Sequence, residues 1–142
     1  MTPDLAQIDI PRLAHEVIAV YSFNVRVVRL LAREHAFRPL FFWQPVITTK
    51  ELKTPHERRW TNDYTNDPAR RQDLYRAVVV ERRQCRELLD VPGVVDLSAL
   101  FDDWRDPVYI DLYHLSEAGN AAVAEAMLPT VAEAVSAALR GN

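Results

Sequence analysis

Asp111 and His114 stand three positions apart in the stretch DLYHLSEAGN, just before a long alanine-rich segment. A histidine can act as a general base when an acceptor holds its Nδ1–H and its Nε2 faces the group that loses a proton. A carboxylate three residues earlier, in a turn before a helix, can fold back to be that acceptor. Because such a spacing also arises by chance, the alternative is that Asp111 only orders a loop and His114 only stands near a helix start.

A hydrolytic site of this kind also needs a nucleophile. The serines are Ser22, Ser98, Ser116 and Ser136, and none of them follows a Gly-Asp pair. We expect Ser22 and Ser136 to lie within helices and Ser116 to cap one. Cys85 is expected to be a half-buried helix residue rather than a reactive thiol.

Metal ligation is the other chemistry that these residue types permit. His56 and Glu57 could in principle join Asp111 and His114 around an ion, but nothing in their spacing fixes a ligand geometry. We therefore expect no metal and no other cofactor.

The bulk composition narrows the class of protein. A chain of 142 residues predicts a single domain over residues 1–142. The net charge of −3 gives no reason to expect a nucleic-acid partner or an acidic membrane surface. We also expect no membrane span and no signal peptide, and the sequence does not indicate a compartment.

The first half of the chain predicts one helix and one strand. A helix is expected over 11–36, and the apolar run over 40–43 favours a buried strand. A polar connection over 48–66 follows, with room for a short helical turn near 55–60. The residues expected to face the core from the first helix are Leu13, Val17, Val20, Tyr21, Val28 and Leu31.

The second half predicts helix, strand and helix. Asp67 and Pro68 are a cap and a first residue for a helix over 67–89. A second strand is expected over 94–97, and a last helix should run from the Ser116 cap to about residue 140. Alternation of this kind is typical of α/β proteins with a parallel sheet.

Two stretches also resemble a known family, the SGNH (GDSL-type) hydrolases. The run over 109–124 is similar to the family's C-terminal block, in which a D-x-x-H-[LP]-[ST]-x-x-G pattern supplies the Asp and His of a Ser-His-Asp triad. FFWQPV over 41–46, followed by Lys50 and by T-P-x-E over 54–57, resembles the strand and loop before that block. The resemblance covers about residues 10 to 140.

The resemblance implies a fold and an activity. The fold would be α/β, a partial three-layer α/β/α (flavodoxin-like SGNH) arrangement with a small parallel sheet flanked by helices. The activity would be hydrolysis of an acyl ester or O-acetyl group of a small-molecule ester. His114 would be the general base and Asp111 would orient it.

The chain departs from the family in its nucleophile. It has no Gly-Asp-Ser turn, and its Asn62-Asp63 pair lacks the preceding glycine of the family's oxyanion block and comes too late in the chain. The sequence therefore looks like the C-terminal part of an SGNH domain without its N-terminal nucleophile half. We expect no serine-hydrolase turnover from this chain alone.

The alternative is a non-catalytic role. A truncated α/β domain would leave the sheet edge near 40–44 unpaired, and such an edge favours pairing with another chain. The protein would then be a ligand-binding or protein-interaction module with a tendency to self-associate. The arginine pairs at 58–59 and 70–71 are expected to be solvated surface residues.

Overall fold

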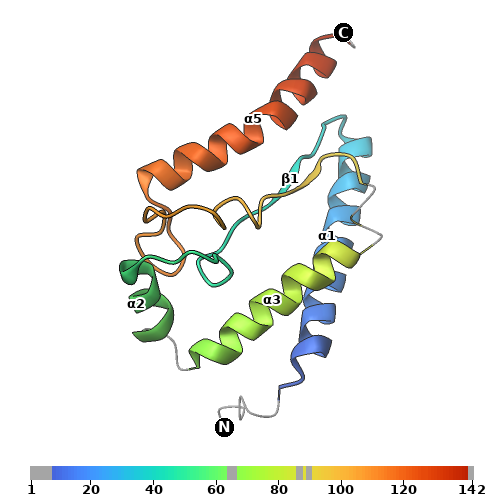
Figure 1. Ribbon diagram of the computed structural model, residues 1–142. Coiled ribbons are helices and arrows are strands. Elements are labelled where there is room, and N and C mark those ends of the chain that lie inside the picture. Colours follow the sequence, from blue (N-terminus) through green and yellow to red (C-terminus); the bar gives the residue numbers. More distant parts are fainter. Residues whose placement is uncertain (1–7, 64–66, 86–87, 89–90, 141–142) are drawn as a thin grey trace.

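The computed structural model of the protein describes residues 8–63, 67–85, 88 and 91–140. Helices dominate, and two short strands run between them (Figure 1). In chain order the elements are α1 (Ile10–Glu34), β1 (Phe41–Trp43), α2 (Pro55–Asp63), α3 (Pro68–Gln84), β2 (Val94–Asp96) and α5 (Glu117–Arg140).

Side-chain caps begin the two helices that pack together, α1 and α3. The Asp9 carboxylate accepts a hydrogen bond from the Arg12 N–H at 3.1 Å, and Asp67 accepts one from Arg70 N–H at 3.0 Å. Each cap satisfies an amide that has no partner inside the helix, and a proline in each first turn removes one more. Both predicted helix starts are confirmed.

The two strands pair in parallel, with Phe41 opposite Val94 and Trp43 opposite Asp96. The Phe41 N–H donates to the Gly93 carbonyl at 2.7 Å. Gly93 has a φ of 84°, and a Cβ there would lie 3.0 Å from the Pro39 carbonyl oxygen. A glycine is therefore needed for the turn into β2.

The predicted partial three-layer α/β/α fold is wrong. Helix accounts for 60% of the molecule and strand for 6%, and the sheet has only β1 and β2. Pro39 and Pro45 flank β1 and cannot donate ladder hydrogen bonds, so the strand stays short. No third strand pairs with these two in the described part of the chain.

The first core lies where α1 and α3 pack on the strands. Its buried members are Ala14, Ile18, Val25, Val78 and Leu88. The face of α1 that is buried differs from the predicted one: Val20 is 61% and Leu31 47% exposed. The more apolar stripe of α1, which includes Val20 and Leu31, is left uncovered by the described residues.

A second core joins the loops to the start of α5. Ile47, Phe101, Val108 and Tyr109 are buried there, and Ala122 and Val123 of α5 pack against them. The C-terminal half of α5 extends away from the rest of the molecule (Figure 1).

The helix α5 is long and apolar enough to cross a membrane by length and composition alone. We had expected no segment of this kind. A single such helix is weak support for a membrane span, because helices of soluble proteins meet the same criterion. Leu128 is 62% and Leu139 75% exposed, so the described residues leave much of its apolar surface uncovered.

Candidate functional site

The structure brings Asp111 and His114 into direct contact. The His114 Nδ1 lies 2.7 Å from Asp111 Oδ2. The other carboxylate oxygen, Oδ1, accepts the backbone N–H groups of Tyr113 and His114, each at 2.8 Å. One oxygen of the Asp111 carboxylate therefore bonds to the backbone of its own loop, and the other oxygen bonds to the His114 imidazole.

The ends of this loop are also fixed. The Ile110 N–H donates to the His114 carbonyl at 3.0 Å, and the Ser116 N–H donates to the Val108 carbonyl at 2.8 Å. Tyr109 and Leu115 form an isolated antiparallel bridge between these bonds. Residues 108–116 therefore make a tight, closed turn at the entrance to α5.

These hydrogen bonds set the charge of Asp111. Those from the Tyr113 and His114 amides, and then the one from the imidazole, lower the pKa of the Asp111 carboxyl to about 2. The carboxylate is therefore ionised at neutral pH and accepts Nδ1–H. The neutral imidazole then has a bare Nε2, for which the described residues supply no hydrogen-bond partner, and the side chain is 72% exposed.

A second imidazole–carboxylate pair provides a comparison. His15 Nδ1 of α1 lies 2.8 Å from Glu81 Oε1 of α3, with side-chain exposures of 72% and 34%. The contact distance and exposure nearly equal those of His114 and Asp111, which are 72% and 32% exposed. The two pairs differ in that backbone amides also donate hydrogen bonds to Asp111.

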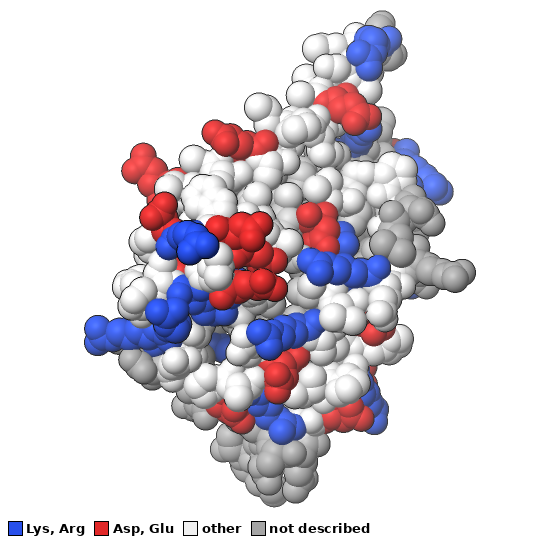
Figure 2. Space-filling view, viewed as in Figure 1, with Lys and Arg blue, Asp and Glu red and all other residues white. Residues whose placement is uncertain are grey.

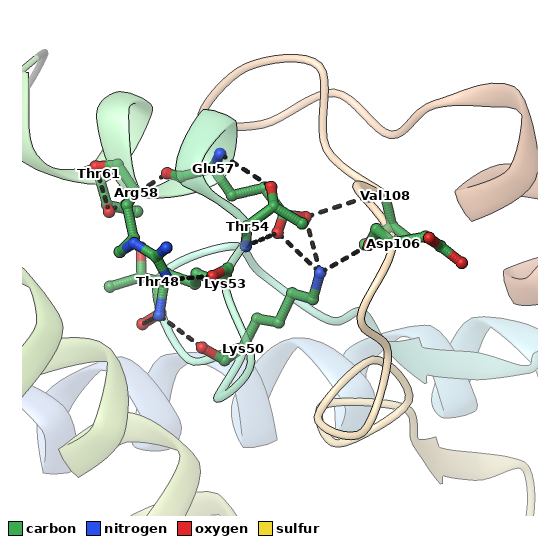
Figure 3. Close-up of polar contacts among 9 residues, drawn as sticks. All are labelled: Thr48, Lys50, Lys53, Thr54, Glu57, Arg58, Thr61, Asp106 and Val108. Carbon is green, nitrogen blue, oxygen red and sulfur yellow. Dashed lines mark hydrogen bonds and ion pairs between the residues drawn. The ribbon is translucent and has the colours of Figure 1, made fainter.

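A buried ion pair between Lys50 and Glu57 contacts Asp106 and Val108, which lead into this turn (Figure 3). Lys50 Nζ donates to Glu57 Oε2 at 2.7 Å, to Glu57 Oε1 at 2.9 Å and to the Asp106 carbonyl at 3.0 Å. The Lys50 side chain is 1% exposed and that of Glu57 is 0% exposed. All three ammonium protons are used, so the pair leaves no donor of Lys50 unsatisfied.

Glu57 links three segments through its two oxygens. Oε1 also accepts the Val108 N–H at 3.1 Å, and Oε2 accepts the Thr54 N–H at 2.8 Å. Thr54 Oγ1 accepts the Glu57 N–H at 3.3 Å, which completes a capping box at the start of α2. Burial alone would raise the pKa of Glu57, but hydrogen bonds from Lys50, Thr54 and Val108 outweigh it and lower the pKa.

Gly119 lets α5 approach the backbone at Val108, which Glu57 holds by a hydrogen bond. A Cβ at Gly119 would lie 2.7 Å from the Val108 carbonyl oxygen, closer than atoms tolerate. Ser116 caps the helix, its Oγ accepting the Gly119 N–H at 3.2 Å, as predicted. The nine residues from Asp111 to Gly119 therefore include the Asp111–His114 pair, the Ser116 helix cap and the glycine that allows close contact with Val108.

The other predicted positions are distributed over the structure. Ser22 is buried on α1, and Ser98 Oγ accepts from Arg83 at 3.2 Å. Cys85 lies just after the end of α3 and packs on the first core, so its predicted position inside the helix is wrong. The pair at 62–63 ends α2 and is not in a loop.

The residues considered for a metal do not form one cluster. Among the described residues, no group of three or more His, Cys, Asp or Glu side chains is arranged to hold an ion. Glu57 forms an ion pair with Lys50. The Nε2 of His56 accepts a hydrogen bond from the Trp60 indole N–H at 3.1 Å.

The sequence prediction did not identify two features. The T-P-x-E capping box could have indicated that Glu57 folds back to the Thr54 N–H, but no local pattern indicates that Glu57 pairs with Lys50. The contact of Arg71 with Tyr113, 3.1 Å from Nη2 to the hydroxyl, joins residues far apart in sequence, and no local pattern indicates it.

Comparison with protein-family models, with curated proteins and with solved structures finds no match for this chain.

Proposed function

We propose that Asp111 and His114 are the orienting acid and the general base of an ester-hydrolysing site. The substrate class is an acyl ester or O-acetyl group of a small molecule. The proposal rests on the three hydrogen bonds that Asp111 accepts from its own loop and from His114. They fix the tautomer that leaves Nε2 able to take a proton.

The reaction needs a hydroxyl nucleophile beside Nε2. The nucleophile oxygen would attack the ester carbonyl while its proton moves to Nε2, and the resulting imidazolium would be stabilised by the Asp111 carboxylate. The imidazolium then returns the proton to the leaving alkoxide, which completes acyl transfer. Water repeats the sequence with His114 again as base, releasing the acid.

The described serines are poorly placed to be this nucleophile. Ser116 accepts the Gly119 N–H as a helix cap, Ser22 is buried on α1, and Ser98 accepts a hydrogen bond from Arg83. Ser136 lies on the C-terminal half of α5, which extends away from the rest of the molecule (Figure 1). All four serines of the chain are among the described residues, so we propose that a serine of another polypeptide completes the site.

A serine-directed probe tests the proposal. The tagged chain is returned to an extract of its source and treated with a fluorophosphonate, which labels activated serines. We expect a labelled serine that depends on the added chain, is lost with His114→Ala and is kept with His15→Ala. Labelling that does not depend on His114 would refute the role of His114 as the base. Robust His114-dependent turnover of p-nitrophenyl acetate by the chain alone would refute the proposal that the serine lies outside this chain.

A second candidate function is association through the open edge of β1. Phe41 and Trp43 bond to β2, so strand alternation directs the N–H and carbonyl of Phe42 to the opposite edge. Phe42 also lines a groove of about 880 Å³ together with residues of α1 and α3, and Val17 and Leu74 contribute to its apolar lining. An exposed edge beside apolar surface favours pairing with a second copy of the chain.

Sedimentation velocity over a concentration series tests this candidate. We expect a monomer–dimer equilibrium that Val17→Glu weakens at least about tenfold, because it places a charge in the groove. Val20→Glu is the matched control, since Val20 is on the same helix, 61% exposed and outside the groove lining. A monomer at every concentration up to about 100 μM would exclude the candidate.

A further inference from the structure

A recess of about 200 Å³ lies between the loop after β1, α2, the start of α3 and the turn that carries Asp111. Lysine and arginine side chains gather over α2 in Figure 2, and acidic ones lie beside them on the same face. None of the described acidic side chains lines the recess itself. We call it the basic recess, and the lining residues used below are Thr48, Lys53, Arg58, Arg71, Gln72 and Leu112.

Carbonyl oxygens, not carboxylates, accept hydrogen bonds from two of the cations of the basic recess, Lys53 and Arg58. Lys53 Nζ donates to the Thr48 carbonyl at 3.1 Å and to the Lys50 carbonyl at 2.5 Å. Arg58 folds back so that its Nη1 donates to the Lys53 carbonyl, as Figure 3 shows. Within the described part of the chain, neither side chain forms an ion pair.

Arg71 supplies the third cation, from the first turns of α3. Its Nη2 donates to the Tyr113 hydroxyl at 3.1 Å, and no described carboxylate pairs with it. A guanidinium has five N–H donors, so Arg58 and Arg71 each keep most of theirs for other acceptors. The Gln72 amide adds two more donors at the wall.

Three like charges around one small cavity repel one another. Burial and the nearby positive charges of Arg76 and Lys50 lower the pKa of Lys53, although the Glu57 and Asp102 carboxylates act in the opposite direction. A bound anion would relieve this repulsion. Phosphate fits best among small anions, because it carries up to two charges and its oxygens match the paired N–H groups of arginine.

We propose that the basic recess binds the phosphate group of a small-molecule ligand. The proposal does not depend on ester hydrolysis at His114. One extension does: Tyr113 directly precedes His114, so a phosphate-bearing ester held by Arg71 would lie beside the base, and that step rests on the proposed function.

Titration with inorganic phosphate and with glycerol phosphate, followed by two-dimensional NMR at constant ionic strength, tests the proposal. We expect saturable shifts at the Thr48, Gln72 and Leu112 amides with both ligands. Arg71→Gln and Arg58→Gln should each weaken binding at least about tenfold, the loss expected for one charge-assisted pair. Arg140→Gln, which removes the same charge near the end of α5, should leave binding unchanged.

Four further results complete the test. Acetate at the same ionic strength should bind at least tenfold more weakly than phosphate, which separates phosphate recognition from general anion binding. Tighter binding of glycerol phosphate than of phosphate would assign the recess to phosphate esters. His114→Ala should bind phosphate normally, which separates this proposal from the catalytic one. Shifts that never saturate, or equal weakening by Arg71→Gln and Arg140→Gln, would overturn the proposal.

Discussion

Among the described residues, the same kind of imidazole–carboxylate contact occurs twice. His114 and Asp111 are 2.7 Å apart in a closed turn, and His15 and Glu81 are 2.8 Å apart between two helices. Their exposures are nearly equal, so neither distance nor solvent access separates them. The difference is that two backbone amides hold Asp111 and the buried Lys50–Glu57 pair holds the segment before its turn, whereas Glu81 is positioned by its place on α3. A short contact between acid and base does not by itself indicate a site; the way in which the acid is held does.

Removing the buried Lys50–Glu57 ion pair should have the largest effect on stability. Lys50→Met leaves the Glu57 charge buried beside two backbone amides, and we expect it to lower the free energy of unfolding by about 3–5 kcal/mol. Urea denaturation measures the loss. The histidine NMR signals should show His114 losing its fixed environment while His15 keeps its own.

The exposed pair of Arg12 and Glu16 supplies the control for that experiment, with side-chain exposures of 76% and 56%. Arg12→Met should cost less than about 1 kcal/mol. Equal losses for Arg12→Met and Lys50→Met would mean that the buried pair does not support the turn.

Gly119→Ala should have the next largest effect. Alanine is a better helix former than glycine, yet its Cβ would lie 2.7 Å from the Val108 carbonyl oxygen. We expect the free energy of unfolding to fall by about 1–3 kcal/mol, because either the backbone at Val108 or the helix must shift. Ala118→Gly, on the exposed side of the same turn, should cost about 0.5–1 kcal/mol. A stabilised Gly119→Ala variant would show that α5 does not pack closely against the backbone at Val108.

The tautomer of His114 provides a finer test of the comparison. Asp111→Asn should shift the neutral imidazole from Nδ1–H toward Nε2–H by about tenfold, since a charged acceptor is lost. Long-range ¹⁵N–¹H NMR spectra report the ratio directly. Glu81→Gln is the matched change at His15 and should leave the His114 ratio unchanged. If His114 already favours Nε2–H in the unsubstituted protein, Asp111 does not orient it.

Acid titration should produce the smallest change. The pKa of Asp111 is lowered to about 2 in the folded protein, from an ordinary value near 4. Ionised Asp111 therefore favours the folded turn above about pH 4, and this contribution disappears as pH falls through about 2. The carboxyl ¹³C shift of Asp111 and the amide shifts of Tyr113 and His114 should share one midpoint there. A midpoint near 4 would mean that the amides do not hold the carboxylate.

Local patterns predicted what depends on neighbours in sequence. The caps at Asp9 and Asp67, the cap at Ser116 and the parallel pairing of the two strands are all confirmed. Each follows from a backbone amide or an apolar run a few residues away. The overall fold class was wrong because the number of strands that pair depends on the whole molecule. The predicted buried face of α1 was wrong for a related reason, since the packing of α3 and the strands decides which face of the helix is covered.

The sequence by itself therefore determined the helix starts, the two strands and the proximity of Asp111 to His114, all of which are short-range consequences of backbone hydrogen bonding. Only the tertiary structure decided which charged residues are neutralised. It buried Lys50 against Glu57, and it gathered Arg58 and Arg71, predicted to be plain surface residues, around a recess without a described carboxylate. Electrostatic energy depends on distance and burial, and chain folding sets both between residues that the sequence keeps apart.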